Sequence, residues 1–217
     1  MKDMIRLILV VLVVGVAQSS WAQTEVEKRL PVSGHDRLDL ELPFADEISL
    51  KTWNNTEVLV KATVSINDGE DDDLFELEIT DSQSTIYVEA NKDFNKRSGK
   101  DRNCWEMEIH YEVYFPRNME VDAKTISGDY VMEFYGKPAN IKTISGDVDL
   151  TVPSARGLDF RVKTISGEVY SDLDISYPNG TKGLRQMVGT NVDGEVNGGG
   201  EFLDLETISG DIFLRKG

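Results

Sequence analysis

The chain has 217 residues, with 40% hydrophobic and 29% charged residues and a formal net charge of −16 at pH 7. This length is enough for one domain with a sizeable hydrophobic core. So acidic a chain repels phosphate, which argues against nucleic acid and anionic membrane surfaces as partners and favours cations or basic partners.

The N-terminus has the pattern of a targeting segment. Residues 1–6 carry two basic side chains, residues 7–16 are nearly all aliphatic, and residues 20–22 (SWA) offer small residues at a cleavage site. We predict a signal peptide over 1–22 and a single β-strand-repeat domain over 23–217, exported to the periplasm, the cell surface or the medium. The apolar run is too short to span a bilayer, so no stable membrane insertion is expected after cleavage; a retained N-terminal anchor is the alternative.

The first half of the mature chain alternates apolar and polar residues, as strands do. The alternation is clear over residues 38–42, 48–52, 58–66, 75–79, 86–90 and 105–115. No stretch has a helical period. Residues 48–60 are predicted to form a degenerate corner, because residues 51–53 (KTW) resemble the start of a motif that recurs later. The repeat is therefore expected to extend through the whole mature chain.

Two loops are distinguished by their charge. Residues 67–73 (NDGEDDD) could bind Ca²⁺ through several carboxylates, but they lack the spacing of a formed calcium loop, which favours a solvated turn. Residues 92–102 (KDFNKRSGKDR) form a basic island. The island is interpreted as a solvated connector, with docking of an acidic partner or a glycan carboxylate as the alternative.

A seven-residue motif dominates the second half. It reads KTISGDV at 142–148 and returns as KTISGDY at 124–130, KTISGEV at 163–169 and ETISGDI at 206–212, with a worn copy, TNVDGEV, at 190–196. The copies recur at intervals of about 20 residues, which is typical of repeat folds whose units bury their apolar faces by stacking.

The apolar pattern changes parity inside each motif. Ile141 and Thr143 share one parity, whereas Ile144 and Val148 share the other, so Ile144 is grouped with the inward residues of the following strand. Such a change followed by Ser-Gly predicts a corner between two short strands. The glycines that would form the corners are Gly128, Gly146, Gly167, Gly194 and Gly210.

These features predict an all-β fold. The predicted form is a β-solenoid, similar to a single-stranded β-helix, or a β-roll built from stacked short strands with T-I-S-G-D/E corners. Irregular intervals leave a sandwich-like arrangement open. The longest interval holds residues 176–186 (SYPNGTKGLRQ), which are expected to form a protruding loop.

Stacked corners would also align acidic side chains. This candidate binding ladder comprises Asp129, Asp147, Glu168, Glu195 and Asp211. Rows of carboxylates and hydroxyls can bind sugars or divalent cations. The favoured interpretation is structural, because Ser and Thr satisfy backbone groups in turns and a solvated acidic row costs little in water.

Catalytic signals are absent from the sequence. The two histidines, His35 and His110, do not form an H-E-x-x-H motif, and there is no G-x-S-x-G or glycine-rich phosphate loop. Cys104 is the single cysteine, so no intramolecular disulfide is expected, and a half-buried strand residue is the favoured interpretation. We predict no catalytic residues, cofactor or metal.

Residues 111–116 (YEVYFP), followed by the repeated T-I-S-G-D/E-V motif, resemble the bacterial putative-adhesin family of β-strand-repeat proteins of unknown function. The resemblance implies an exported, envelope-associated, β-solenoid-like domain. The expected function is a non-catalytic, adhesin-like binding or scaffold module for an envelope protein or a glycan. The alternatives are a periplasmic accessory protein of envelope sensing and a carbohydrate-active enzyme on a β-solenoid.

Overall fold

The computed structural model describes residues 23–94, 105–177 and 190–217, and these residues form strands almost throughout. The all-β prediction is confirmed, and the helical content described is limited to a short 3-10 turn, η1 (Asp72–Leu74), and the helical residue Phe94. The strands before the repeats are β1 (Thr24–Pro31), β2 (Arg37–Glu41), β3 (Phe44–Trp53), β4 (Glu57–Ile66), β5 (Leu77–Ser82), β6 (Thr85–Ala90) and β7 (Met107–Pro116). The later strands are β8 (Glu120–Glu133), β9 (Ala139–Ser145), β10 (Val148–Val152), β11 (Leu158–Ser166), β12 (Val169–Ser171), β13 (Ile175–Ser176), β14 (Thr190–Val196), β15 (Glu201–Ser209) and β16 (Ile212–Lys216).

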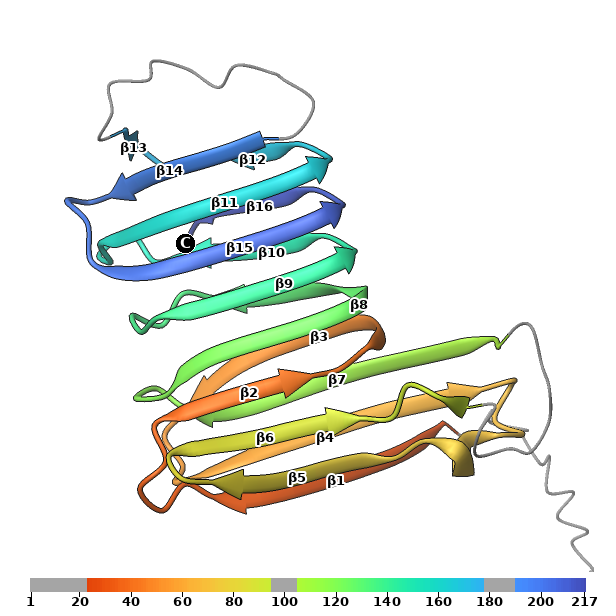
Figure 1. The fold of residues 1–217 in the computed structure, drawn as a ribbon. Coiled ribbons are helices and arrows are strands. Elements are labelled where there is room, and N and C mark those ends of the chain that lie inside the picture. The colour runs from red at the N-terminus through yellow and green to blue at the C-terminus, as the bar shows by residue number, and fades with distance from the viewer. Residues whose placement is uncertain (1–22, 95–104, 178–189) are drawn as a thin grey trace, which may run out of the picture.

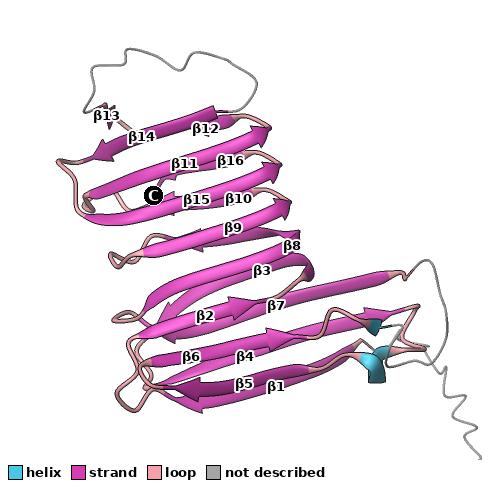
Figure 2. Ribbon diagram, in the orientation of Figure 1, coloured by secondary structure: helices cyan, strands magenta, loops and turns pink. Residues whose placement is uncertain are grey.

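The strands lie in two layers with the core between them (Figure 1). The first layer has the order β5-β6-β2-β8-β9-β15-β11-β14-β13. The second has the order β1-β4-β7-β3-β8-β10-β16-β12. Because the long strand β8 contributes to both layers, the hydrogen bonding forms one open 16-stranded sheet, and loops occupy mainly the ends of the strands (Figure 2).

Inward side chains form rows that cross the strands. Ala123, Ile141, Leu205 and Val162 lie side by side on β8, β9, β15 and β11, and all four are fully buried. Each row is possible because alternate residues of every strand face the core. Full burial of an aliphatic side chain of this kind stabilises the fold by about 1.5–3 kcal/mol.

Four arches carry the recurring motif. Each arch runs along the first layer, turns a corner and returns along the second layer: the bent strand β8, then β9/β10, β11/β12 and β15/β16. The arches stack in parallel, but not in chain order, because β15 lies between β9 and β11, and β16 lies between β10 and β12 (Figure 1). Successive coils of a solenoid stack in chain order, so the solenoid prediction is not confirmed.

A fifth arch precedes these four in space. Strands β2 and β3 pair in parallel with the two halves of β8, and the chain passes between the layers at Pro43, whose carbonyl accepts hydrogen bonds from the amides of Ile126 and Ser127. The corner predicted at residues 51–53 is therefore wrong. Those residues end β3, and β3 and β4 both pair with β7 in the same layer.

Candidate functional site

The corner glycines form a column in which each one lies against its neighbour. A Cβ atom added to Gly146 would lie 2.2 Å from the carbonyl oxygen of Gly128, and one added to Gly210 would lie 2.1 Å from that of Gly146. One added to Gly167 would lie 1.9 Å from the carbonyl oxygen of Gly210. Real Cβ atoms do not approach so closely, so glycine is required for the arches to stack at hydrogen-bonding distance.

Gly194, the fifth predicted corner, is not at a corner. It lies in the middle of β14, opposite Phe160 of β11, in an antiparallel pair. A Cβ there would lie 2.6 Å from the ring of Phe160 and 2.8 Å from Ile175. The worn motif therefore keeps its glycine because a large aromatic ring occupies the adjacent space.

The motif threonines form a buried column beside the glycines. Thr143 donates a 3.4 Å hydrogen bond to the carbonyl of Gly128, Thr207 donates a 3.1 Å bond to Gly146, and Thr164 donates a 3.0 Å bond to Gly210. Thr125, in the first motif, donates to the carbonyl of Ser127 in its own arch. These hydroxyls therefore each supply a hydrogen bond to a backbone carbonyl at a corner.

The predicted acidic ladder has a backbone role. The Asp129 carboxylate accepts a hydrogen bond from the amide of Asp147 at 2.8 Å, and Asp147 accepts one from Asp211 at 2.7 Å. Asp211 in turn accepts a 2.8 Å bond from the amide of Glu168. Four of the five predicted residues therefore lie together. Glu195 does not join them, since it lies on β14 opposite Asp159.

Two residues that differ from the consensus of the motif, Glu168 and Glu206, are explained by the order in which the arches stack. Glu168, the single Glu among the four aligned acids, belongs to β11/β12, the last arch of the column, and accepts a hydrogen bond from the Tyr170 hydroxyl. Glu206 replaces the lysine of the other motifs, and its strand lies between those of Lys142 and Lys163. It forms ion pairs with both lysines.

The motif isoleucines point outward and form a row on the first layer. Ile126, Ile144, Ile208 and Ile165 are 42%, 48%, 42% and 48% exposed. The prediction that Ile144 faces inward is wrong. Thr143 is the last inward residue before the corner, so the residue after it faces solvent, and inward packing resumes only at Val148.

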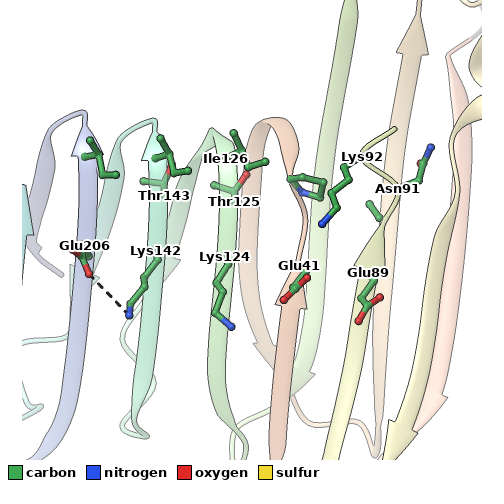
Figure 3. Close-up of a pocket in the computed structure, with 14 residues that line it drawn as sticks. Glu41, Glu89, Asn91, Lys92, Lys124, Thr125, Ile126, Lys142, Thr143 and Glu206 are labelled. Carbon is green, nitrogen blue, oxygen red and sulfur yellow. Dashed lines mark ion pairs between the residues drawn. The ribbon is translucent and has the colours of Figure 1, made fainter. Parts of the chain in front are cut away.

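Three of these isoleucines line a groove of about 520 Å³ (Figure 3). We call it the isoleucine groove. Its apolar wall is formed by Ile126, Ile144, Ile208 and Pro43, which come from three separate motifs and the β2/β3 corner. Sequence reasoning missed the groove because these residues are far apart in the chain. The isoleucine that recurs at the same place in four motifs was the available signal.

A charged row borders the isoleucines. Glu89, Glu41, Lys124, Lys142 and Glu206 occupy adjacent places on β6, β2, β8, β9 and β15, and their side chains project along the groove (Figure 3). The hydrogen bond from Lys163 lowers the pKa of Glu206 below its usual value. Partial burial lowers the pKa of Lys124, but Asp39 and Asp122 outweigh it and leave the pKa raised.

The acidic loop at 67–73 forms a turn that its own side chains stabilise. Asp72 is buried and accepts hydrogen bonds from the amide of Ile66 at 2.6 Å and the hydroxyl of Thr24 at 2.7 Å. Asn67 donates a 2.6 Å bond to Asp71. Within residues 23–94, 105–177 and 190–217, no three His, Cys, Asp or Glu side chains are grouped to hold a metal ion.

Other features singled out by sequence lie mainly beyond the described residues. These are the predicted signal peptide 1–22, Cys104, most of the basic island 92–102 and most of the loop 176–186. Lys92, at the start of the basic island, is described and lines the isoleucine groove. In the part of the chain that the structure describes, no helix is long and apolar enough to cross a membrane.

The stacked arches and their corner columns define a class of all-β repeat proteins. The chain belongs to the Toastrack DUF4097 family, which it matches over residues 54–215. No curated protein matches it.

Among solved structures, it is similar to a putative cell adhesion protein from Clostridium sporogenes ATCC 15579. The TM-score is 0.57 at 12% identity, over 90% of this chain and 100% of that one. A putative adhesin from Bacteroides fragilis NCTC 9343 aligns over 90% of this chain and 98% of its own, with a TM-score of 0.26 and 8% identity. The first of these likenesses supports the fold.

Proposed function

We propose that this chain is a non-catalytic, adhesin-like binding module of the bacterial cell envelope, and that the isoleucine groove is its contact surface. The observation that carries the proposal is the row of isoleucines, each more than 40% exposed, at the same place in four motifs. The Thr, Gly and acidic positions of the motif have backbone contacts that the fold needs. The isoleucines have no such role, and a contiguous exposed apolar row marks an interaction site.

Two further observations support this function. The putative cell adhesion protein from Clostridium sporogenes has a similar fold, and the N-terminal pattern of residues 1–22 is that of an export signal. This signal supports the proposed location at the envelope. An accessory role in envelope sensing would use the same groove for a membrane protein partner.

The test is binding of the purified protein to intact bacterial cells. Protein from cells that express the full chain is labelled and titrated onto cells, and it is compared with the triple variant I126T/I144T/I208T. We expect saturable binding by the wild type and at least about tenfold weaker binding by the variant, since three central apolar contacts are lost.

The matched control is V131T/F202T, which changes two exposed apolar residues outside the groove. It should bind like the wild type. Equal binding by the wild type and the isoleucine variant would rule out the groove as the contact surface. Cleavage of the protein by an impermeant protease on intact cells would separate surface display from a periplasmic role.

A further inference from the structure

We propose that the isoleucine groove binds a second copy of this chain, through a two-fold contact whose axis runs parallel to β6, β2, β8 and β9. The inference rests on the proposed function, because it names the partner of the same groove. The order of charges along the groove and the direction of its strands carry it.

Four adjacent residues of the charged row, the ones that precede Glu206, change sign once at their centre. Glu89, Glu41, Lys124 and Lys142 stand directly side by side, so the order is negative, negative, positive, positive. Adjacent strands are about 4.8 Å apart, so like charges lie together. Among the described residues, neither Glu41 nor Glu89 takes part in an ion pair. Lys142 forms an ion pair with Glu206 at 4.0 Å, but its side chain is 43% exposed, so its ammonium is accessible to a second carboxylate.

The four strands all run in the same direction. A two-fold axis parallel to them, midway between β2 and β8, turns a second copy to face the first. It preserves the direction of the strands but reverses their order. Glu41 then faces Lys124 of the second copy, and Glu89 faces Lys142 of the second copy. Symmetry repeats both pairs, so the contact contains four opposite-charge pairs.

The same axis brings apolar residues together. Because the strand direction is kept, the isoleucine side of one groove meets the isoleucine side of the other. Pro43, which lies beside Ile126 on the neighbouring strand, then faces Ile126 of the second copy. A two-fold axis perpendicular to the strands would instead place each charged residue opposite the same residue of the second copy. These like charges would repel one another. The charge order therefore selects one arrangement.

The net charge of −16 opposes this association at long range. At physiological ionic strength this repulsion is screened beyond about 8 Å, whereas the facing pairs are in contact. On an envelope surface, the contact would join copies of this chain to one another.

The experiment uses two opposite charge-reversal variants, E41K/E89K and K124E/K142E. Each gives positions 89, 41, 124 and 142 the same charge, so each should self-associate about tenfold or more weakly than the wild type in sedimentation velocity at 0.15 M salt. Their equimolar mixture should recover association, because the four positive positions now face the four negative ones. The fourfold variant, which carries all these substitutions, should also recover it.

The control K28E/K61E makes the same change in net charge as K124E/K142E, but on β1 and β4 of the other layer. It should associate like the wild type. Thermal unfolding of every variant verifies the fold, and the exposed positions of Glu41, Glu89 and Lys124 predict little change.

Wild-type protein that stays monomeric at every concentration, or variants whose mixture does not associate, would overturn the inference. If the monomeric wild type still binds cells and I126T/I144T/I208T does not, the proposed function stands and the groove takes another protein, a glycan or a lipid. If the isoleucine variant binds cells normally, the proposed function fails whatever the oligomeric state.

Discussion

The inner and outer sides of the same corner obey different rules. On the inner side, Thr143, Gly146 and Asp147 each contact the backbone of a neighbouring arch, and each residue type is explained by that contact. On the outer side, Ile144 and Lys142 project into a groove. One short motif thus contains residues that build the stack and residues that the stack does not require. The difference teaches that recurrence alone does not separate structural residues from binding residues.

The largest expected effect is on the inner side, at Gly146. Gly146→Val places a side chain 2.2 Å from the Gly128 carbonyl oxygen, and we expect the free energy of unfolding to fall by about 3 kcal/mol or more. Chemical denaturation measures it.

A matched comparison separates crowding from backbone conformation. Gly146 and Gly198 both have positive φ, but a Cβ on Gly198 meets nothing within 4 Å. Gly198→Ala should therefore cost only about 1 kcal/mol, and Gly146→Ala clearly more. Equal losses would mean that the close stacking of arches is not what selects glycine.

The next largest effect on stability is expected in the column of motif threonines. Thr207 is fully buried and donates to Gly146, so Thr207→Val keeps the shape but removes this hydrogen bond from a partly buried carbonyl. The expected loss is about 1–3 kcal/mol of unfolding free energy, measured by denaturation. Thr207→Ser retains the hydroxyl and should preserve the hydrogen bond. A valine variant as stable as the wild type would show that the column is not needed.

A smaller, pH-dependent effect is expected at Glu206, on the outer side. Its pKa is lower in the folded protein than the usual 4.5, so its ion pair with Lys163 stabilises the fold above that pH and is lost as the pH falls through the folded-state pKa. The pair is partly exposed, so the contribution is at most about 1 kcal/mol.

Glu206→Gln should lower stability slightly at pH 7 and flatten the acid-side loss below pH 4.5. Thermal melts at pH 3 to 7 measure this. Lys163→Gln should have the same effect, and the double variant should add little to either. Additive losses would show that the two side chains act independently.

The smallest expected effect on stability is at Ile144. Because this side chain is 48% exposed, Ile144→Thr should change the free energy of unfolding by less than about 0.5 kcal/mol. Together with a loss of binding, this result would sharpen the distinction between the two sides of the corner. A loss of several kcal/mol would assign the isoleucine to the fold instead.

The sequence predicted the local features well. The all-β class follows from period-two alternation, and four of the five predicted corner glycines do lie in the stacked column. The corner at Pro43 was missed because Pro43, Phe44 and Ala45 share no residue with the Ile-Ser-Gly motif, although Ala45 occupies the place beside Gly128. Gly194 was misassigned because the position of a glycine in the sequence does not show whether a neighbouring backbone or a neighbouring aromatic ring excludes its Cβ.

Alternation and turn chemistry act between residues close in the chain, so the sequence by itself determined most strands, the corners of the four Thr-Ile-Ser-Gly motifs and the acidic, all-β character. The stacking order depends on hydrogen bonds between distant segments, and only the tertiary structure placed the last arch between two earlier ones. Glu206 and Glu168 differ from the motif consensus in the sequence alone. The contacts that explain them depend on which strands lie next to theirs in the stack. The groove, too, exists only after residues 41–43, 124–126, 142–144 and 206–208 have come together, because no local interaction specifies their alignment.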